Sequence, residues 1–241
     1  MKNPKKKVAF SIGGKGGDGK TTLIASLAEW YLENQIPCTL LDLDTENKKK
    51  GSFSHFFPDR AAKIDIYTPA GLDAFIDQAD KEPDVILADM GAGSGKVSVA
   101  WFNSMYESVA DTLAFTAIGM VTSDPATVES LLNWAAQLQD RVSYLVVLNR
   151  QEDLQEDFTY WEKAAEAIAF REAFHPPIIR MEARLPDLQH AVRNHGYTLG
   201  KVIRRETAAA ELAKSSLVVR AQAYRRQHFA EFDRVKETLL P

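Results

Sequence analysis

The chain is poor in the residues from which disulfides and metal clusters are built. It has 241 residues and a single cysteine, Cys38. A disulfide within the chain is therefore impossible, and a cysteine-ligated metal cluster would need ligands from several chains. Cys38 precedes an apolar run, which favours a buried strand residue. A reducing, cytoplasmic location is the simplest interpretation of such low cysteine usage.

Long apolar runs and a strong net charge are also absent. No stretch approaches 18 apolar residues, so we predict no transmembrane helix. The net charge is only −4, but it is unevenly spread. From residue 196 to the end there are nine Lys/Arg and five Asp/Glu, which leaves +4 there and −8 in the rest. This basic region predicts either a surface that faces a polyanion or a solvated helix face of mixed charge.

Apolar strand patterns alternate with helical ones along the whole chain. Such alternation predicts one doubly wound α/β domain over residues 1–241, with a mostly parallel sheet flanked by helices and a helical basic region over about 196–241. The expected helices have apolar residues at helical spacing or a proline start. The expected strands are 8–12, 38–43, 64–67, 84–88, 112–121, 143–148 and 177–180. The expected helices are 21–34, 72–79, 125–139, 158–170 and most of the chain after 185.

A glycine-rich loop joins the first strand to the first helix. Residues 14–21, GKGGDGKT, fit the phosphate-loop pattern G-x-x-x-x-G-K-[ST]. Glycines let the backbone wrap closely, so that N–H groups point at phosphate oxygens, and the helix start adds its positive end. In this motif Lys20 would neutralise the β- and γ-phosphates and the Thr21 hydroxyl would bind Mg²⁺.

Four polar residues follow predicted strands: Asp42, Asp44, Asp89 and Asn149. Ligands of doubly wound sheets bind beyond the carboxyl ends of the strands, so we expect these side chains to share one site with the phosphate loop. Asp18 is the unusual member of that loop. An acid beside phosphates should weaken their binding unless it points away or meets a cation.

The loop has a second lysine, Lys15, in front of Gly16. The run KGGDGKT resembles the deviant phosphate loop, K-G-G-x-G-K-[ST], of the ParA/MinD superfamily of ATPases. That resemblance implies ATP and Mg²⁺ as cofactors, and an ATP-dependent homodimer in which Lys15 reaches the nucleotide of the partner. It implies a nucleotide-binding set of Gly14, Gly16, Gly17, Asp18, Gly19, Lys20, Thr21, Thr22, Asn149 and Arg150.

Further segments are similar to the switch and strand motifs of this superfamily. Residues 42–47, DLDTEN, imply Asp44 as the residue that orients the attacking water, and Asp42 as support for the Mg²⁺ shell. Residues 85–89, VILAD, resemble a Walker B strand whose Asp89 holds Mg²⁺. Asn149 would hydrogen-bond the adenine, with Arg150 beside it. The expected catalytic residues are therefore Lys15, Lys20 and Asp44, and the metal residues are Thr21, Asp42 and Asp89.

The resemblance implies a slow, partner-stimulated ATPase that positions a cargo such as plasmid DNA or a protein complex through an activator or cargo adaptor. The asparagine-containing switch is similar to the plasmid TraL/StbB kind. Nonspecific DNA would meet the basic residues Lys201, Arg204, Arg205, Lys214, Arg220, Arg225 and Arg226. Two alternatives stay open: a small-molecule ligase similar to dethiobiotin synthetase, and a slow ATP-binding assembly factor.

Overall fold

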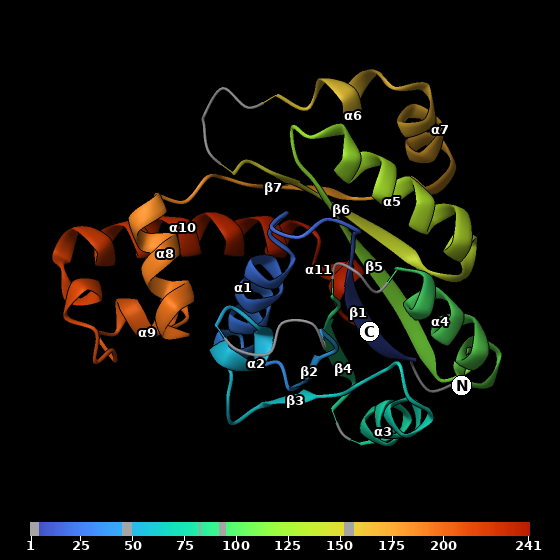
Figure 1. Ribbon diagram of the computed structural model, residues 1–241, viewed down its shortest axis with the longest axis horizontal. Coiled ribbons are helices and arrows are strands. Elements are labelled where there is room, and N and C mark those ends of the chain that lie inside the picture. The colour runs from blue at the N-terminus through green and yellow to red at the C-terminus, as the bar shows by residue number, and fades with distance from the viewer. Residues whose placement is uncertain (1–4, 45–49, 82, 92–94, 152–156) are drawn as a thin grey trace.

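A parallel sheet of seven strands forms the centre of the molecule (Figure 1). The computed structural model describes residues 5–44, 50–81, 83–91, 95–151 and 157–241. The spatial order of the strands is β3-β2-β4-β1-β5-β6-β7, and every pairing is parallel. The strands are β1 (Lys6–Ile12), β2 (Cys38–Asp42), β3 (Ala61–Lys63), β4 (Val85–Asp89), β5 (Leu113–Val121), β6 (Ser143–Asn149) and β7 (Ile178–Met181).

Helices cover both faces of this sheet, which confirms the predicted doubly wound α/β class (Figure 1). The helices are α1 (Lys20–Glu33), α2 (Phe53–Phe56), α3 (Pro69–Ala79), α4 (Gly95–Val109), α5 (Pro125–Leu138), α6 (Thr159–Lys163), α7 (Ala165–Phe174), α8 (Pro186–His195), α9 (Leu199–Ile203), α10 (Ser215–Arg234) and α11 (Lys236–Leu239), with 3₁₀ turns η2 (Gln139–Arg141) and η3 (Ala210–Ala213). Among the described residues, no helix has the length and apolar character needed to cross a membrane.

Side chains alternate between the two faces along the central strands. In β1, Val8, Phe10 and Ile12 join one buried cluster, whereas Ala9 joins the other. Both sides must be apolar because successive side chains of a strand point to opposite faces and helices cover each face. The first cluster packs under α3 to α7 and the second under α1, α2, α10 and α11.

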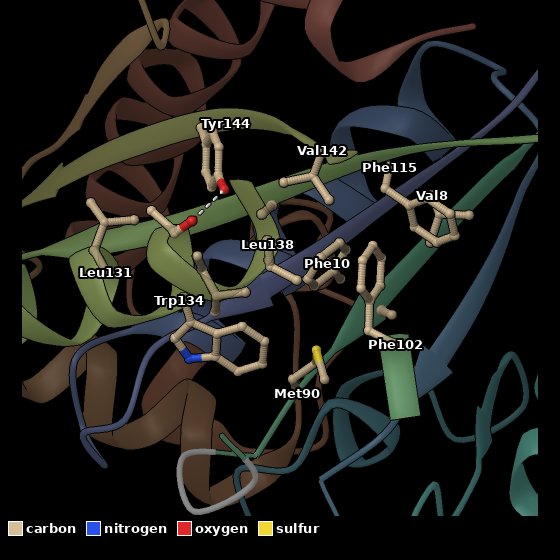
Figure 2. Close-up of a cluster of buried hydrophobic side chains, with 14 of the residues drawn as sticks. Val8, Phe10, Met90, Phe102, Phe115, Leu131, Trp134, Leu138, Val142 and Tyr144 are labelled. Atoms are coloured by element: carbon tan, nitrogen blue, oxygen red, sulfur yellow. Dashed lines mark hydrogen bonds between the residues drawn. The ribbon is translucent and has the colours of Figure 1, made fainter. Parts of the chain in front are cut away.

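Aromatic rings fill much of the first cluster, as Figure 2 shows. The ring of Phe115 on β5 meets Phe102 of α4 edge-on, with centroids 5.2 Å apart, and Phe10 of β1 at 6.4 Å. Edge-to-face pairs of this kind add to the stabilisation from burial alone. These contacts join α4 to the two central strands β1 and β5.

The C-terminal helices have a smaller core of their own. Residues of α8, α9, η3 and α10 form a third buried cluster that includes Leu188, Leu199, Leu212 and Val218. Farther along α10, Phe232 joins the second cluster under the sheet, as do Val235 and Leu239. The end of α10 and helix α11 therefore pack against the sheet.

Three expectations about elements were wrong. The strand expected at 64–67 lies at Ala61–Lys63, because Asp65 and Thr68 form a turn and a helix cap instead. The helix expected at 158–170 is two helices, α6 and α7, because Ala164 between them is extended (ψ 132°). Helix α4 was missed altogether, although Phe102, Met105 and Val109 have helical spacing. Three glycines in residues 91–95 weaken the helical pattern in the sequence where α4 begins.

Candidate functional site

A cavity of about 680 Å³ opens at the carboxyl edge of the sheet. Its wall includes phosphate-loop residues 16–22, Asp44, Asn149 and Arg150, so the structure brings these predicted residues together. Volumes of this order suit ligands of nucleotide size. The cavity continues past the loop, along α1, toward α8 and α9, where its lining includes Glu29, Arg184 and Gln189.

The phosphate loop has the backbone that its glycines predict. Gly17 and Gly19 have φ values of +85° and +102°, which disfavour any other residue. Cβ atoms placed on Gly16 or Gly17 would meet nothing within 4 Å, so this part of the loop is open. Gly19 is tightly packed, since its Cβ would lie 2.5 Å from Asn149 Nδ2. The loop thus leads from β1 directly into α1.

Asn149, the last residue of β6, contacts the backbone of the phosphate loop. Its Nδ2 donates to the carbonyl oxygen of Asp18 at 2.8 Å, and Gln151 Nε2 donates to the carbonyl of Gly17. The next residue, Arg150, forms an ion pair with Glu182 at 3.1 Å. Asn149 and Arg150 were predicted as base-side residues, and the contact of Asn149 adds a role in shaping the loop.

The two loop lysines have different surroundings. Lys20 is 6% exposed, and its ammonium lies 2.8 Å from both carboxylate oxygens of Asp18 and 2.8 Å from the carbonyl of Lys15. The side chain of Lys15 is 50% exposed and pairs with Asp124, the N-cap of α5. The backbone N–H of Gly14 donates to Ser130, also on α5. The first residues of the loop, Gly14 and Lys15, are therefore held against α5, and Lys20, where the loop enters α1, is the buried lysine.

Thr21 and Asp89 meet where β4 ends beside α1. The Thr21 hydroxyl donates to Asp89 Oδ2 at 2.7 Å, and the Ser11 hydroxyl donates to Oδ1 at 3.1 Å. Burial raises the pKa of Asp89 to about 7, and the negative charges of Asp42 and Asp44 act in the same direction. A buried carboxylate of this kind gains from a nearby cation, so this pair fits a divalent metal.

Asp42 organises the segment after β2. Its Oδ2 accepts hydrogen bonds from the Ser54 backbone N–H at 3.0 Å and from the Ser54 hydroxyl at 2.6 Å. Its Oδ1 accepts from the Asp44 backbone N–H at 3.1 Å. Asp42 also lies opposite Asp89 in the sheet, so its predicted part in the Mg²⁺ shell stays a prediction. Residues 45–47 of the predicted switch lie outside the described part of the chain.

Sequence reasoning missed a buried polar group beside the cavity. Glu29 of α1 accepts from the N–H groups of Leu199 and Gly200, at 3.1 and 2.6 Å. Arg184, which follows β7, donates to Ser26 at 2.9 Å, and burial lowers its pKa to about 10. His228 of α10 lies 3.4 Å from the same serine. No motif marks these residues, because they come from distant parts of the chain.

The region after β7 also lines the cavity. Met181, Glu182 and Arg184 contribute to the wall, whereas Arg180, within β7, is exposed. Side chains at the carboxyl end of a strand reach the ligand crevice, whereas those within the strand face the layers of the sheet. The part of β7 that reaches the cavity therefore begins at Met181.

The site fits a nucleoside phosphate and Mg²⁺ on the chemistry of its donors. The open glycine backbone, the start of α1 and the Lys20 ammonium are donors for phosphate oxygens. The oxygens of Thr21 and Asp89 are hard ligands of the kind that Mg²⁺ prefers. One feature opposes phosphate: the Asp18 carboxylate already holds Lys20.

Comparison with known proteins shows solved structures with a similar fold. No protein-family model and no curated protein sequence matches the chain. Among solved structures, the MinD cell division protein of Aquifex aeolicus superposes with a TM-score of 0.51 at 15% identity, covering 90% of this chain and 96% of that one. A nucleotide-binding protein of Archaeoglobus fulgidus, in complex with ADP, gives 0.50 at 18% identity, over 86% and 92%.

The chain has the MinD fold. A second Aquifex aeolicus structure, the MinC:MinD complex, gives a TM-score of 0.50 at 14% identity and covers 98% of both chains. The shared fold therefore extends through the C-terminal helices. This confirms the α/β fold that the alternating strand and helix patterns predicted, and the TraL/StbB subtype stays a prediction.

Proposed function

We propose that the protein is a Mg-ATP-dependent switch ATPase of the ParA/MinD type, which dimerises on ATP and positions a cargo. The MinD-like fold and the phosphate loop support a nucleotide site. The cargo is plasmid DNA or a protein complex, recruited through an activator or adaptor protein. Hydrolysis is slow until that partner binds.

One observation carries the dimer proposal: the loop presents its two lysines in opposite ways. Lys20 is buried in the loop of its own chain, whereas the Lys15 side chain is half exposed beside Asp124 of the α5 cap. A half-exposed lysine is accessible to a second copy, where it would stabilise charge on the transferred phosphoryl group as an arginine finger does. In the monomer, the ion pair with Asp124 of the same chain holds the Lys15 side chain.

The remaining site residues divide the chemistry among them. Bound Mg-ATP supplies the phosphoryl group and the cation that neutralises it. Lys20 and the backbone N–H groups bind the phosphates, and Thr21 and Asp89 hold the cation. Asp44, which lines the cavity and is oriented through Asp42, orients the attacking water.

The basic C-terminal residues form the proposed DNA surface. Three of the seven have contacts within the described chain: Arg204 and Arg225 pair with Glu33 at 3.1 and 2.9 Å, and Arg205 donates to the Ala213 carbonyl and the Ser215 hydroxyl. Lys214, Arg220 and Arg226 are exposed near or on α10. Exposed cations on a helix bind phosphates without reading sequence, so this surface would bind DNA nonspecifically.

The dimer proposal is tested on Asp44→Ala, which keeps the phosphate loop but removes the water-orienting carboxylate. We expect light scattering to show a dimer with Mg-ATP and a monomer without it. The double variant Lys15→Ala, Asp44→Ala should bind ATP and stay monomeric. Lys163→Ala in the same background replaces an exposed lysine of α6 and should dimerise normally. ATP binding by Asp44→Ala without any change in mass would refute the proposed switch.

A further inference from the structure

Asp18 lies inside the phosphate loop rather than at its surface. The residue is 4% exposed, and both of its carboxylate oxygens lie 2.8 Å from Lys20 Nζ. Its Oδ1 also accepts a long hydrogen bond, 3.4 Å, from the backbone N–H of Lys20, the first residue of α1. A Cβ on Gly13 would lie 2.9 Å from Oδ2, so the carboxylate is enclosed by the loop itself.

These donors are the ones that a phosphate loop uses to bind its ligand. The lysine ammonium binds the β- and γ-phosphates, and the N–H groups at the helix start bind phosphate oxygens. A carboxylate is planar and a phosphate is tetrahedral, but both present anionic oxygens that accept hydrogen bonds from these donors. Asp18 thus makes, within the chain, contacts that a bound phosphate would make.

We propose that Asp18 is an internal competitor for the nucleotide phosphates, which occupies the Lys20 ammonium until a nucleoside di- or triphosphate displaces its carboxylate. The inference rests on the proposed nucleotide-binding function. It explains why an acid is tolerated in this loop: in the empty site the acid meets the cation of the P-loop lysine. Lys15 is held in the same way by Asp124, so both loop lysines are neutralised within the chain.

The electrostatic balance makes this contact displaceable. Burial raises the pKa of Asp18, whereas the charge and hydrogen bonds of Lys20 lower it, so the buried carboxylate depends on that one cation. A polyphosphate with Mg²⁺ offers Lys20 more charge than one carboxylate does. Only a ligand with a β-phosphate reaches Lys20, so the competition should act on ATP and ADP but not on AMP.

The test compares wild type with Asp18→Asn and Asp18→Ala by isothermal titration calorimetry with Mg-ATP, Mg-ADP and AMP. Hydrogen bonds between charged groups are the strong ones, so removing the competitor should tighten ATP and ADP binding about tenfold or more. AMP affinity should not change. Asp111→Asn is the matched control, because Asp111 is exposed just before β5, at the opposite edge of the sheet.

Thermal unfolding separates competition from a structural role. Without nucleotide, both Asp18 variants should unfold at lower temperature than wild type, because Lys20 loses its buried partner. With Mg-ATP, the rise in Tm should be larger than in wild type. Equal or weaker ATP binding by both variants, with wild type binding ATP, would overturn the inference alone. No ATP binding by wild type or by either variant would overturn the inference together with the proposed function.

Discussion

Glu29 joins α1 to the C-terminal helices, and its removal should loosen that junction. The side chain is 7% exposed and accepts from the N–H groups of Leu199 and Gly200 at the start of α9. Burial raises the pKa of Glu29, opposed by its hydrogen bonds and by the charge of Arg184. The carboxylate therefore satisfies two buried donors that have no other partner in the described chain.

The expected cost follows from those two bonds. Glu29→Gln keeps one acceptor oxygen but places an NH₂ group against the second N–H, so one bond to a charged acceptor is lost. Such bonds are worth about 1.5–3 kcal/mol each, so we expect a loss of about 2 kcal/mol in the free energy of unfolding. For a chain of this size, that corresponds to a fall in Tm of roughly 4–8 °C.

Urea unfolding and hydrogen exchange measure the effect at two levels. Urea titration gives the change in the free energy of unfolding, and exchange should accelerate at the Leu199 and Gly200 amides. The matched control is Glu33→Gln, one turn later on the same helix. Glu33 is 38% exposed and pairs with Arg204 and Arg225, so its loss should cost less than about 1 kcal/mol.

The test is which variant, Glu29→Gln or Glu33→Gln, loses more free energy of unfolding. If Glu33→Gln destabilises the protein as much as Glu29→Gln, burial and backbone donors are not what makes the junction strong. Unchanged exchange at residues 199 and 200 in Glu29→Gln would likewise contradict the reasoning, because it would show those N–H groups to be protected by something else.

His228 and the exposed arginines of α10 give two further predictions. Burial, then the charge of Arg184, lowers the pKa of His228 to about 3, so stability should be lost as pH falls from 6.5 toward 3, because only the unfolded chain gains the proton. At pH 5 this amounts to about 2 kcal/mol, and urea titrations should show less acid sensitivity for His228→Asn than for the exposed control His190→Asn. In DNA filter binding, Arg220→Gln and Arg226→Gln should each lower the slope of log K against log salt by about 0.9, whereas Arg225→Gln, whose residue pairs with Glu33, should not. Binding that is insensitive to salt would exclude the proposed DNA surface.

Much of the fold could be read from local patterns. The predicted strands around β1, β2, β4, β5, β6 and β7 all formed, because apolar runs of this length with polar ends specify buried parallel strands. Helix α5 begins at Pro125, as its proline start predicted, with Asp124 as its cap. The missed α4 and the displaced β3 lie where glycines and turn residues leave the local pattern ambiguous.

The site was predicted as a set of residues but not as a set of contacts. Phosphate-loop glycines, Lys20, Thr21 and Asp89 occupy one edge of the sheet, as a strand-loop-helix motif requires. The pairing of Asp18 with Lys20 could not be predicted, because a side chain two residues away can point outward or inward at equal sequence distance. Asp42 lies opposite Asp89, so its part in the Mg²⁺ shell stays a prediction, and its bond to Ser54, twelve residues on, could not be read from the sequence.

What the sequence by itself determined is the chemistry of the phosphate loop and the class of fold that carries it. A run such as GKGGDGKT constrains its own backbone, and alternating strand and helix patterns constrain the layers around it. Only the tertiary structure decided which charges meet: Asp18 with Lys20, Lys15 with Asp124, and Glu29 with α9. Those pairings depend on burial and on distances across the fold, and both arise only when remote segments pack together.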